Sequence, residues 1–315
     1  MGKQIVVVGS INLDLVAATE RIPIAGETIA GLTFRTFPGG KGANQAVAAA
    51  RLGGSVSMVG KLGADPFGVQ LRDSLEESRV NTGAVEVVAG SSGVALIVTD
   101  AAGQNAITVI AGANAQLSPA DLDDHIDLIR GAGILLTQLE IPLETVEYLA
   151  GIAAEEHVPL MLDPAPAIPL PVSLLKRIDW LTPNETETCI LTGLPPGEVS
   201  HQSMEAAANT LLESGCRNVI LKLGDRGCYV ALSDGTRQLL PAYAVRALDT
   251  TAAGDAFNGA FAVALMSRKQ PFECASWASA VAAISVTRHG AQTSMPTANE
   301  VETFLEDVQS AKSDR

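Results

Sequence analysis

The sequence is poor in cysteine and in aromatic residues. Its four cysteines are scattered without a C-x-x-C pair, which favours a reducing, cytoplasmic setting over a disulfide framework. Aromatic residues make up 4% of the chain, and the apolar content is mainly Ala, Val, Ile and Leu. That content suits helices packed against parallel strands, so we expect a reduced α/β protein.

Long apolar runs are also missing. No stretch reaches the length of a membrane span. The apolar stretch near the N-terminus is short for a signal peptide and runs directly into Asn12 and Asp14, so it indicates a buried first strand. We therefore expect a cytoplasmic protein without a membrane partner.

Basic residues are scarce relative to acidic ones. The chain has 21 Lys and Arg against 35 Asp and Glu, a net charge of −14, and no cluster of basic residues. Such a surface repels a phosphate backbone, which excludes nucleic acid as an expected partner. An anionic ligand would have to be held by a local device, such as a helix N-terminus or a bound cation.

Several common site motifs are absent. The "GGKG" at residues 39–42 lacks the upstream spacing and the following Ser or Thr of a Walker A loop. No G-x-G-x-x-G follows a strand, which disfavours a nicotinamide dehydrogenase. There is no H-E-x-x-H, and the four histidines are too far apart in the sequence to suggest a zinc site.

The pattern that is present is an alternation of short apolar strands and longer helical stretches. With 315 residues, 47% of them hydrophobic, the chain can form one large α/β domain. Continuous apolar strands between helices predict a mostly parallel sheet covered on both faces. We expect strands over 5–11, 132–139, 158–167, 179–184, 218–224 and 227–233, and helices over 41–54, 143–156, 202–215, 254–267, 272–289 and 297–310.

Two stretches interrupt this alternation. Residues 26–37 and 93–110 alternate apolar and polar side chains, and the second folds back between Asp100 and Asn105. They indicate antiparallel strands inserted into the α/β domain, in segments at about 15–37 and 93–111. Such an inserted sheet is typical of a lid or a dimer surface, although a hairpin without a function is the alternative.

The stretch "DTTAAGDAFNG" (249–259) places Asp255 where a helix is expected to begin. One interpretation is that Asp255 is a helix N-cap. The other is chemical, because Ala252, Ala253 and Gly254 let backbone N–H groups approach a ligand closely at a helix N-terminus. They would form an anion hole for a phosphoryl group, with Asp255 as general base for the attacking hydroxyl. The residues alone leave both interpretations open.

Six segments resemble, in order and spacing, the ribokinase-like (PfkB) family of carbohydrate kinases. "PGGKGANQAVAAARLGG" (38–54) is similar to the family's N-terminal signature, and "DTTAAGDAFNGAF" (249–261) to its C-terminal signature. The resemblance runs from about residue 5 to 305. It implies a single ribokinase-like domain over residues 1–315, with a three-layer α/β/α architecture and a small inserted β-sheet as lid. The other four segments are 9–15, 182–187, 223–227 and 287–296.

The resemblance also implies a sugar site. It places sugar hydroxyls at Asn12 and Asp14, where an amide and a carboxylate can bind a vicinal diol; a turn after the strand is the alternative. Without the resemblance, Lys41 would be a solvated charge and Glu140 a polar residue ending a strand. The remaining sugar contacts that it implies are Gly39, Gly40, Lys41, Asn44 and Glu140, together with Asp255.

A nucleotide site is implied by the same comparison. Asn184 and Glu187 match the family's N-x-x-E element, in which the acid acts on Mg²⁺ through its waters; a capping box at a helix start fits the same residues. Asp225 departs from the expected turn, because an acid near phosphates is unfavourable, and it is left out of the site. The implied ATP contacts are Asn184, Lys222, Gly224, Gly227, Gly254 and Ser279.

A monovalent-cation site is implied beside the anion hole. A carboxylate with carbonyl oxygens suits K⁺, which would fix the geometry of the loop; alternatively, Asp249 only braces the turn. The implied residues are Asp249, Thr251, Val286, Arg288, Gly290 and Ser294.

Taken together, the resemblance implies ATP-dependent phosphorylation of D-ribose at O5, with Mg²⁺ and K⁺ as cofactors and a homodimer formed through the lid strands. Another sugar or nucleoside substrate is the alternative, such as 2-deoxyribose, a fructose-type sugar or adenosine. An amide at Asn12 favours a sugar with a 2-hydroxyl. A non-catalytic sugar-binding relative is a further alternative, although the presence of Asp255 and its glycines disfavours it.

Overall fold

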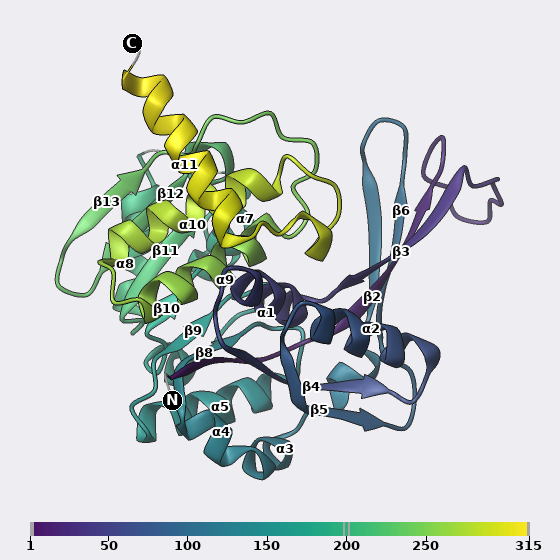
Figure 1. The fold of residues 1–315 in the computed structure, drawn as a ribbon, viewed down its shortest axis with the longest axis horizontal. Coiled ribbons are helices and arrows are strands. Elements are labelled where there is room, and N and C mark those ends of the chain that lie inside the picture. Colours follow the sequence, from purple (N-terminus) through teal and green to yellow (C-terminus); the bar gives the residue numbers. More distant parts are fainter. Residues whose placement is uncertain (1–2, 198, 201, 314–315) are drawn as a thin grey trace.

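A nine-stranded sheet forms the centre of the molecule, in the order β13-β12-β11-β10-β9-β8-β1-β4-β5 (Figure 1). The computed structural model describes residues 3–197, 199–200 and 202–313. Neighbouring strands pair in parallel from β11 to β5, whereas β11–β12 and β12–β13 pair antiparallel, so the expected mostly parallel sheet is confirmed. The strands are β1 (Gln4–Val8), β4 (Val56–Gly63), β5 (Asn81–Val88), β8 (Ala132–Thr137), β9 (Leu160–Leu162), β10 (Trp180–Leu181), β11 (Asn218–Lys222), β12 (Cys228–Leu232) and β13 (Arg237–Leu240).

Helices cover both faces of this sheet, because its central strands are apolar on both sides. In β1, Ile5 and Val7 belong to a core shared with α1, α2, α9 and α10, whereas Val6 and Val8 belong to a core shared with α5 and α8. The three-layer architecture is confirmed. The helices are α1 (Lys41–Arg51), α2 (Pro66–Glu77), α3 (Pro119–Asp124), α4 (Ile126–Arg130), α5 (Leu143–Glu155), α6 (Val172–Leu175), α7 (Glu185–Thr192), α8 (Met204–Glu213), α9 (Ala253–Met266), α10 (Pro271–Ser285) and α11 (Ala298–Ser313), with 3₁₀ turns at Gly112–Gln116, Gly224–Arg226 and Gln292–Ser294.

A separate four-stranded sheet, the small sheet, projects from one side of the molecule (Figure 1). Its order is β3-β2-β6-β7, with β2 (Asn12–Ala18), β3 (Thr33–Gly39), β6 (Gly93–Thr99) and β7 (Asn105–Ile110). The β2–β3 and β6–β7 pairs are antiparallel, which confirms the expected antiparallel strands, whereas β2 and β6 run parallel, which was not expected. Strands this far apart in the sequence are not joined by a short hairpin, and nothing in the connection forces them to run antiparallel.

Some expected boundaries are wrong. The strand expected over 26–37 begins only at Thr33, because the preceding segment turns at Gly26 (φ 81°). The strand expected over 158–167 is limited to Leu160–Leu162, since Pro164 cannot donate to a ladder. The helix expected over 272–289 ends at Ser285. Among the described residues, no helix combines the length and apolarity needed to cross a bilayer.

No helix or strand was predicted from the sequence for residues 55–88, which fold as β4, α2 and β5. A signal for α2 was available in the sequence. Asp65 is its N-cap and accepts a hydrogen bond from the N–H of Gly68 at 2.8 Å, and Pro66 occupies the first helical position.

Close packing of α1 against α9 positions the residues of the site. A Cβ atom on Gly259 would lie 2.7 Å from the Cβ of Ala48 and 2.7 Å from the carbonyl oxygen of Gln45. The two helices can therefore approach this closely only with glycine at position 259. The contact brings the first turn of α9, with Asp255, against the side chains of Asn44 and Gln45.

Candidate active site

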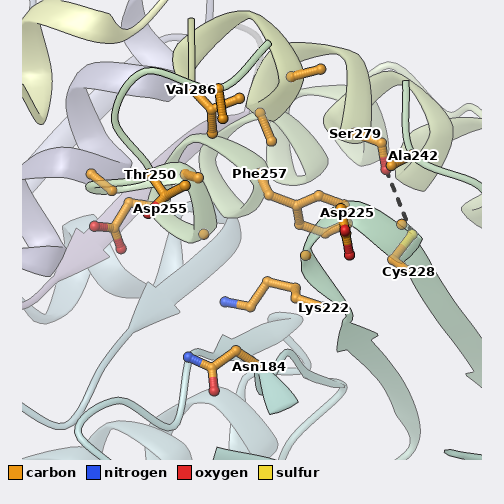
Figure 2. Close-up of a pocket in the computed structure, with 18 of the residues that line it drawn as sticks. Asn184, Lys222, Asp225, Cys228, Ala242, Thr250, Asp255, Phe257, Ser279 and Val286 are labelled. Carbon is orange, nitrogen blue, oxygen red and sulfur yellow. Dashed lines mark hydrogen bonds between the residues drawn. The ribbon is translucent and has the colours of Figure 1, made fainter. Parts of the chain in front are cut away.

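A cavity of about 730 Å³ lies at the carboxyl ends of the parallel strands (Figure 2). Asp163 follows β9, Asn184 follows β10 and Lys222 ends β11, and all three line the cavity. This edge is where open parallel sheets usually bind ligands. Figure 2 shows Asp255 on one side of the cavity and Ser279 on the other. Apolar side chains complete the wall, among them Tyr243, Val245, Phe257, Ala283 and Val286.

Within the part of the chain that the structure describes, the first turn of α9 leaves backbone N–H groups unpaired, although the N–H of Ala253, which was expected in the anion hole, donates to the carbonyl of Thr250 at 3.3 Å. Ala252 is the helix N-cap, in the left-handed region (φ 58°), so the interpretation of Asp255 as N-cap is wrong. Asp255 is instead the third residue of the helix. In the described part of the chain, no acceptor pairs with the backbone N–H groups of Gly254 and Asp255. Unpaired N–H groups at a helix start attract an anion such as a phosphoryl group.

The Asp255 carboxylate is buried and held from both sides. Its Oδ2 accepts a hydrogen bond from Nδ2 of Asn44 at 3.0 Å, and its Oδ1 accepts one from Nε2 of Gln45 at 3.1 Å. Burial raises the pKa of Asp255, an effect that the charge of Lys41 opposes and that of Asp163 reinforces. A carboxyl group with a raised pKa is a better proton acceptor near neutral pH.

Two of the residues expected to bind sugar, Asn12 and Asp14, are on strand β2 of the small sheet. Asn12 begins β2, and its Oδ1 accepts a hydrogen bond from Nδ2 of Asn114 at 2.7 Å. Asp14 lies two residues further on the same strand, backed by Gly39, where a Cβ would lie 2.6 Å from its Oδ2. Burial, followed by the charges of Glu140 and Asp255, raises the pKa of Asp14 to about 7. Both residues are on a strand, so the alternative of a turn at these two positions is wrong.

Lys41 and Glu140, two further residues expected to bind sugar, are in contact with each other. Glu140 accepts hydrogen bonds from the hydroxyl of Ser10 at 2.5 Å and from the backbone N–H of Lys41 at 3.0 Å. Gly40, with φ 88°, makes the turn into α1, and a Cβ there would lie 2.6 Å from the backbone nitrogen of Asn12. Burial opposes the charge of Lys41, but the surrounding carboxylates outweigh it and raise the lysine pKa. Lys41 is thus a charged, half-buried side chain that is surrounded by carboxylates.

The residues expected to bind nucleotide all line the cavity: Asn184, Lys222, Gly224, Gly227, Gly254 and Ser279. Asn184 and Glu187 form a complete capping box for α7, with three hydrogen bonds of 2.7 to 2.9 Å between them. Burial raises the pKa of Glu187, partly offset by the charge of Lys222. Asp225, which the sequence analysis left out, lines the cavity as well.

Two of the expected sugar-site residues, Lys41 and Asp255, also line the cavity, whereas Asn12, Asp14 and Glu140 are outside its described lining. Lys41 and Asp255 therefore lie where the residues expected to bind sugar meet the residues expected to bind nucleotide. A proton acceptor and an anion hole at such a boundary suit transfer of a phosphoryl group from one ligand to another.

Comparisons with known proteins show to which family the chain belongs. The model of the pfkB family carbohydrate kinases matches residues 2–298. The chain belongs to this family. It is 40% identical over 307 residues to the ribokinase of Haemophilus influenzae, covering 97% of this chain and 99% of that protein. It is 39% identical over 303 residues to the deoxyribokinase of Salmonella typhi, covering 96% and 98%. A solved structure of Arabidopsis thaliana ribokinase complexed with ribose and ATP matches with a TM-score of 0.91 and 36% identity, covering 97% and 99%.

Two further buried residues of this pfkB kinase, Gln45 and Asp163, contact the candidate site residues and were not expected from the sequence. Gln45 bonds Asp255, and Asp163 forms an ion pair with Lys222 at 2.9 Å. Asp163 could have been predicted from the sequence, because it is a polar residue directly after an apolar strand. Gln45 is one turn after Lys41 in a helix of small residues, and its polarity there was a weaker signal.

In this pfkB kinase, the residues expected to hold a monovalent cation belong to two loops, which are connected by hydrogen bonds to Asp249. The Asp249 carboxylate accepts hydrogen bonds from the backbone N–H groups of Thr251 and Gly290, both at 2.9 Å. Burial alone would raise the pKa of Asp249, but these bonds outweigh it and hold the pKa below its usual value. The guanidinium of Arg288 pairs with Glu300 at 2.6 Å. Because a guanidinium is a cation without acceptor atoms, the carbonyl oxygen is the group of Arg288 that is suited to a cation.

Proposed function

We propose that this pfkB kinase transfers the γ-phosphoryl group of ATP to the 5-hydroxyl group of D-ribose. The observation that carries the proposal is the place of Asp255, a buried carboxylate at the N-terminus of α9. The cavity beside it is lined by the expected ATP contacts and by Lys41, whereas Asn12, Asp14 and Glu140 are outside that lining. Similarity over nearly the whole chain to proteins named ribokinase supports ribose as the sugar.

In the mechanism that we propose, Asp255 accepts the proton of the attacking hydroxyl. Each of its oxygens receives one amide N–H, from Asn44 and Gln45, which leaves lone pairs for that proton. The N–H groups of Gly254 and Asp255 would hold the negative charge that develops on the transferred group. Positioning and charge stabilisation account for most of the catalysis of phosphoryl transfer, so no further covalent chemistry is required.

Mg²⁺ fits this site through the water molecules that surround it. Both oxygens of Glu187 already accept hydrogen bonds from Asn184, at 2.7 and 2.8 Å, so the carboxylate is suited to the metal's water shell more than to direct coordination. Bound Mg²⁺ would neutralise charge on the ATP phosphates. Asn184 and Lys222 are the neighbouring polar groups that would orient those phosphates.

K⁺ fits only part of the expected ligand set. The carbonyl oxygen of Val286 accepts hydrogen bonds from the backbone N–H groups of Leu248 at 2.7 Å and Asp249 at 3.2 Å, which engage both of its lone pairs. The hydroxyl of Ser294 donates to the carbonyl of Ala291 at 2.7 Å and keeps its oxygen lone pairs. We therefore base the K⁺ proposal on Asp249, Ser294 and the carbonyl oxygens of the expected residues other than Val286.

The small sheet is proposed as a lid over the sugar and as the surface of a homodimer. Ile107 and Val109 are two residues apart on β7 and share one face, where they are 54% and 52% exposed. Leu96 is on the opposite face, since it pairs with Thr108, and Phe34 is exposed on β3. Apolar side chains left exposed on a projecting sheet favour burial against a second copy of the chain.

A 2-deoxyribose substrate is the second candidate, because one relative at 39% identity is named deoxyribokinase. The contact between Asn12 and Asn114 favours ribose. It fixes the Asn12 amide through its oxygen and leaves the amide nitrogen to donate to a ligand. A site built to bond a hydroxyl discriminates strongly against the analogue that lacks it.

An assay of ADP release with Mg²⁺-ATP tests the proposal. Ribose, 2-deoxyribose, fructose and adenosine are compared, each with and without K⁺. We expect the highest kcat/KM for ribose and stimulation by K⁺. A higher value for 2-deoxyribose would overturn the assignment of the sugar, and no turnover with any acceptor would favour a non-catalytic sugar-binding protein.

A further inference from the structure

The side chain of Gln45 is fully buried and makes three hydrogen bonds. Its Nε2 donates to Oδ1 of Asp255 at 3.1 Å and to Oδ2 of Asp163 at 3.0 Å, and its Oε1 accepts from Nε2 of Gln138 at 2.8 Å. An amide nitrogen has two hydrogens, and here each is used on a different carboxylate. The orientation of the amide is therefore determined by its partners.

Asp163 connects this amide to the nucleotide cavity. It is 2% exposed, and its other oxygen accepts a hydrogen bond from Nζ of Lys222 at 2.9 Å. The same Nζ lies 3.1 Å from the position of a Cβ on Gly254, beside the anion hole. In Figure 2 the Lys222 ammonium lies between Asn184 and Asp255. A continuous chain of contacts thus runs from Lys222 through Asp163 and Gln45 to Asp255.

We propose that Gln45 is a positioning residue, which holds Asp255 in place and couples its basicity to the Asp163–Lys222 ion pair. The inference rests on the proposed function. The amide nitrogen of Gln45 donates one hydrogen bond to each of two buried carboxylates and so stabilises both as anions. Hydrogen bonds to charged groups are strong where water is excluded. Burial, the charge of Lys41 and that of Asp163 all act on the pKa of Asp255, and Asp14 is the further carboxyl group coupled to it.

Two substitutions in the kinase test the coupling because they act in opposite directions. Gln45→Met keeps the side-chain length and removes the donor, which destabilises the Asp255 anion. We expect kcat to fall about 10-fold, KM for ribose to stay within about 2-fold, and the acidic limb of the kcat–pH profile to move up by about one pH unit. Asp163→Asn removes a negative charge beside Asp255 and so lowers the pKa of Asp255. We expect the acidic limb of the kcat–pH profile of this variant to move to lower pH.

The matched control is Gln4→Met. The Gln4 side chain accepts a hydrogen bond from Ser57 at 2.9 Å at the opposite, amino-terminal end of the sheet, and its loss should leave the pH profile unchanged. If Gln45→Met does not fold, the downward shift in Asp163→Asn remains a test. Limbs that move in the same direction, or not at all, in variants of an active enzyme would overturn the coupling. An inactive wild-type protein would instead overturn the proposed function.

Discussion

The carboxylate of Asp255 is buried, accepts hydrogen bonds from the side-chain amides of Asn44 and Gln45, and is in the first turn of helix α9. Asn44 also has an Oδ1 atom that is buried and, within the described part of the chain, has no hydrogen-bond partner. Such an acceptor favours a bound hydroxyl at this position, because unpaired buried polar atoms are costly. At the scale of single residues, the proposed base and a candidate ligand contact are therefore adjacent.

The substitution Asp255→Asn is expected to remove the base while preserving the shape of the site. We expect kcat to fall about 10² to 10⁴-fold, the range that proton transfer by a positioned group supplies. The melting temperature should not fall, because a buried charge is removed. Asp73→Asn, at an exposed position on α2, is the control and should retain full activity. Turnover close to wild type in Asp255→Asn would exclude it as the base.

Asp14 is expected to make stability depend on pH. Its pKa is raised from 3.8 to about 7 by burial and by Glu140 and Asp255. The folded state favours the protonated form, so this contribution to stability is fully present below about pH 4 and is lost as the pH rises to 7. Asp14→Asn should therefore raise the melting temperature at pH 8 and change it little at pH 4, as measured by calorimetry. An equal effect at both pH values would contradict the raised pKa.

At the scale of elements, the register of α1 against α9 decides whether the site assembles. Asn44 and Gln45 come from α1 and Asp255 from α9, and the closest approach of the two helices is at Gly259. Because side chains three and four residues apart share a helix face, Asp255 and Gly259 face α1 together. A change in spacing at Gly259 is therefore transmitted to the base.

Gly259→Ala is expected to separate α1 from α9. The added methyl group would overlap with Ala48 and with the backbone at Gln45, which costs about 1 to 3 kcal/mol of unfolding free energy and lowers kcat. Gly151→Ala, in α5, is the matched control, since its nearest neighbour would be the Arg177 guanidinium at 3.6 Å. It should stabilise the protein by up to about 1 kcal/mol. Denaturant unfolding of both variants measures the difference.

Most helices and strands were predictable because apolar periodicity is a local property. The helices over 143–156 and 254–267 match Leu143–Glu155 and Ala253–Met266. Boundaries were harder to predict, since β9 ends where the chain leaves the sheet and β3 begins where its partner β2 is available. The ends of strands depend on hydrogen-bond partners far away in the sequence.

At the scale of the whole molecule, the small sheet leaves apolar side chains exposed, and the proposed homodimer would bury them. Replacing Ile107 and Val109 by lysine should place charge in that interface and convert the dimer into a monomer, as measured by light scattering after size-exclusion chromatography. Val69→Lys, on α2 and outside the small sheet, is the control. A wild-type protein that is already monomeric would overturn the proposed dimer.

The sequence by itself determined the family, the alternation of elements and the candidate base, because motif order and apolar periodicity are written along the chain. Only the tertiary structure decided that Asp255 is inside the first turn of α9 and that Gln45 joins it to Asp163. It also decided that the Val286 carbonyl is already engaged by two N–H groups. These contacts connect residues as far apart as 45 and 255, and their distances depend on how helices pack, which no local pattern encodes.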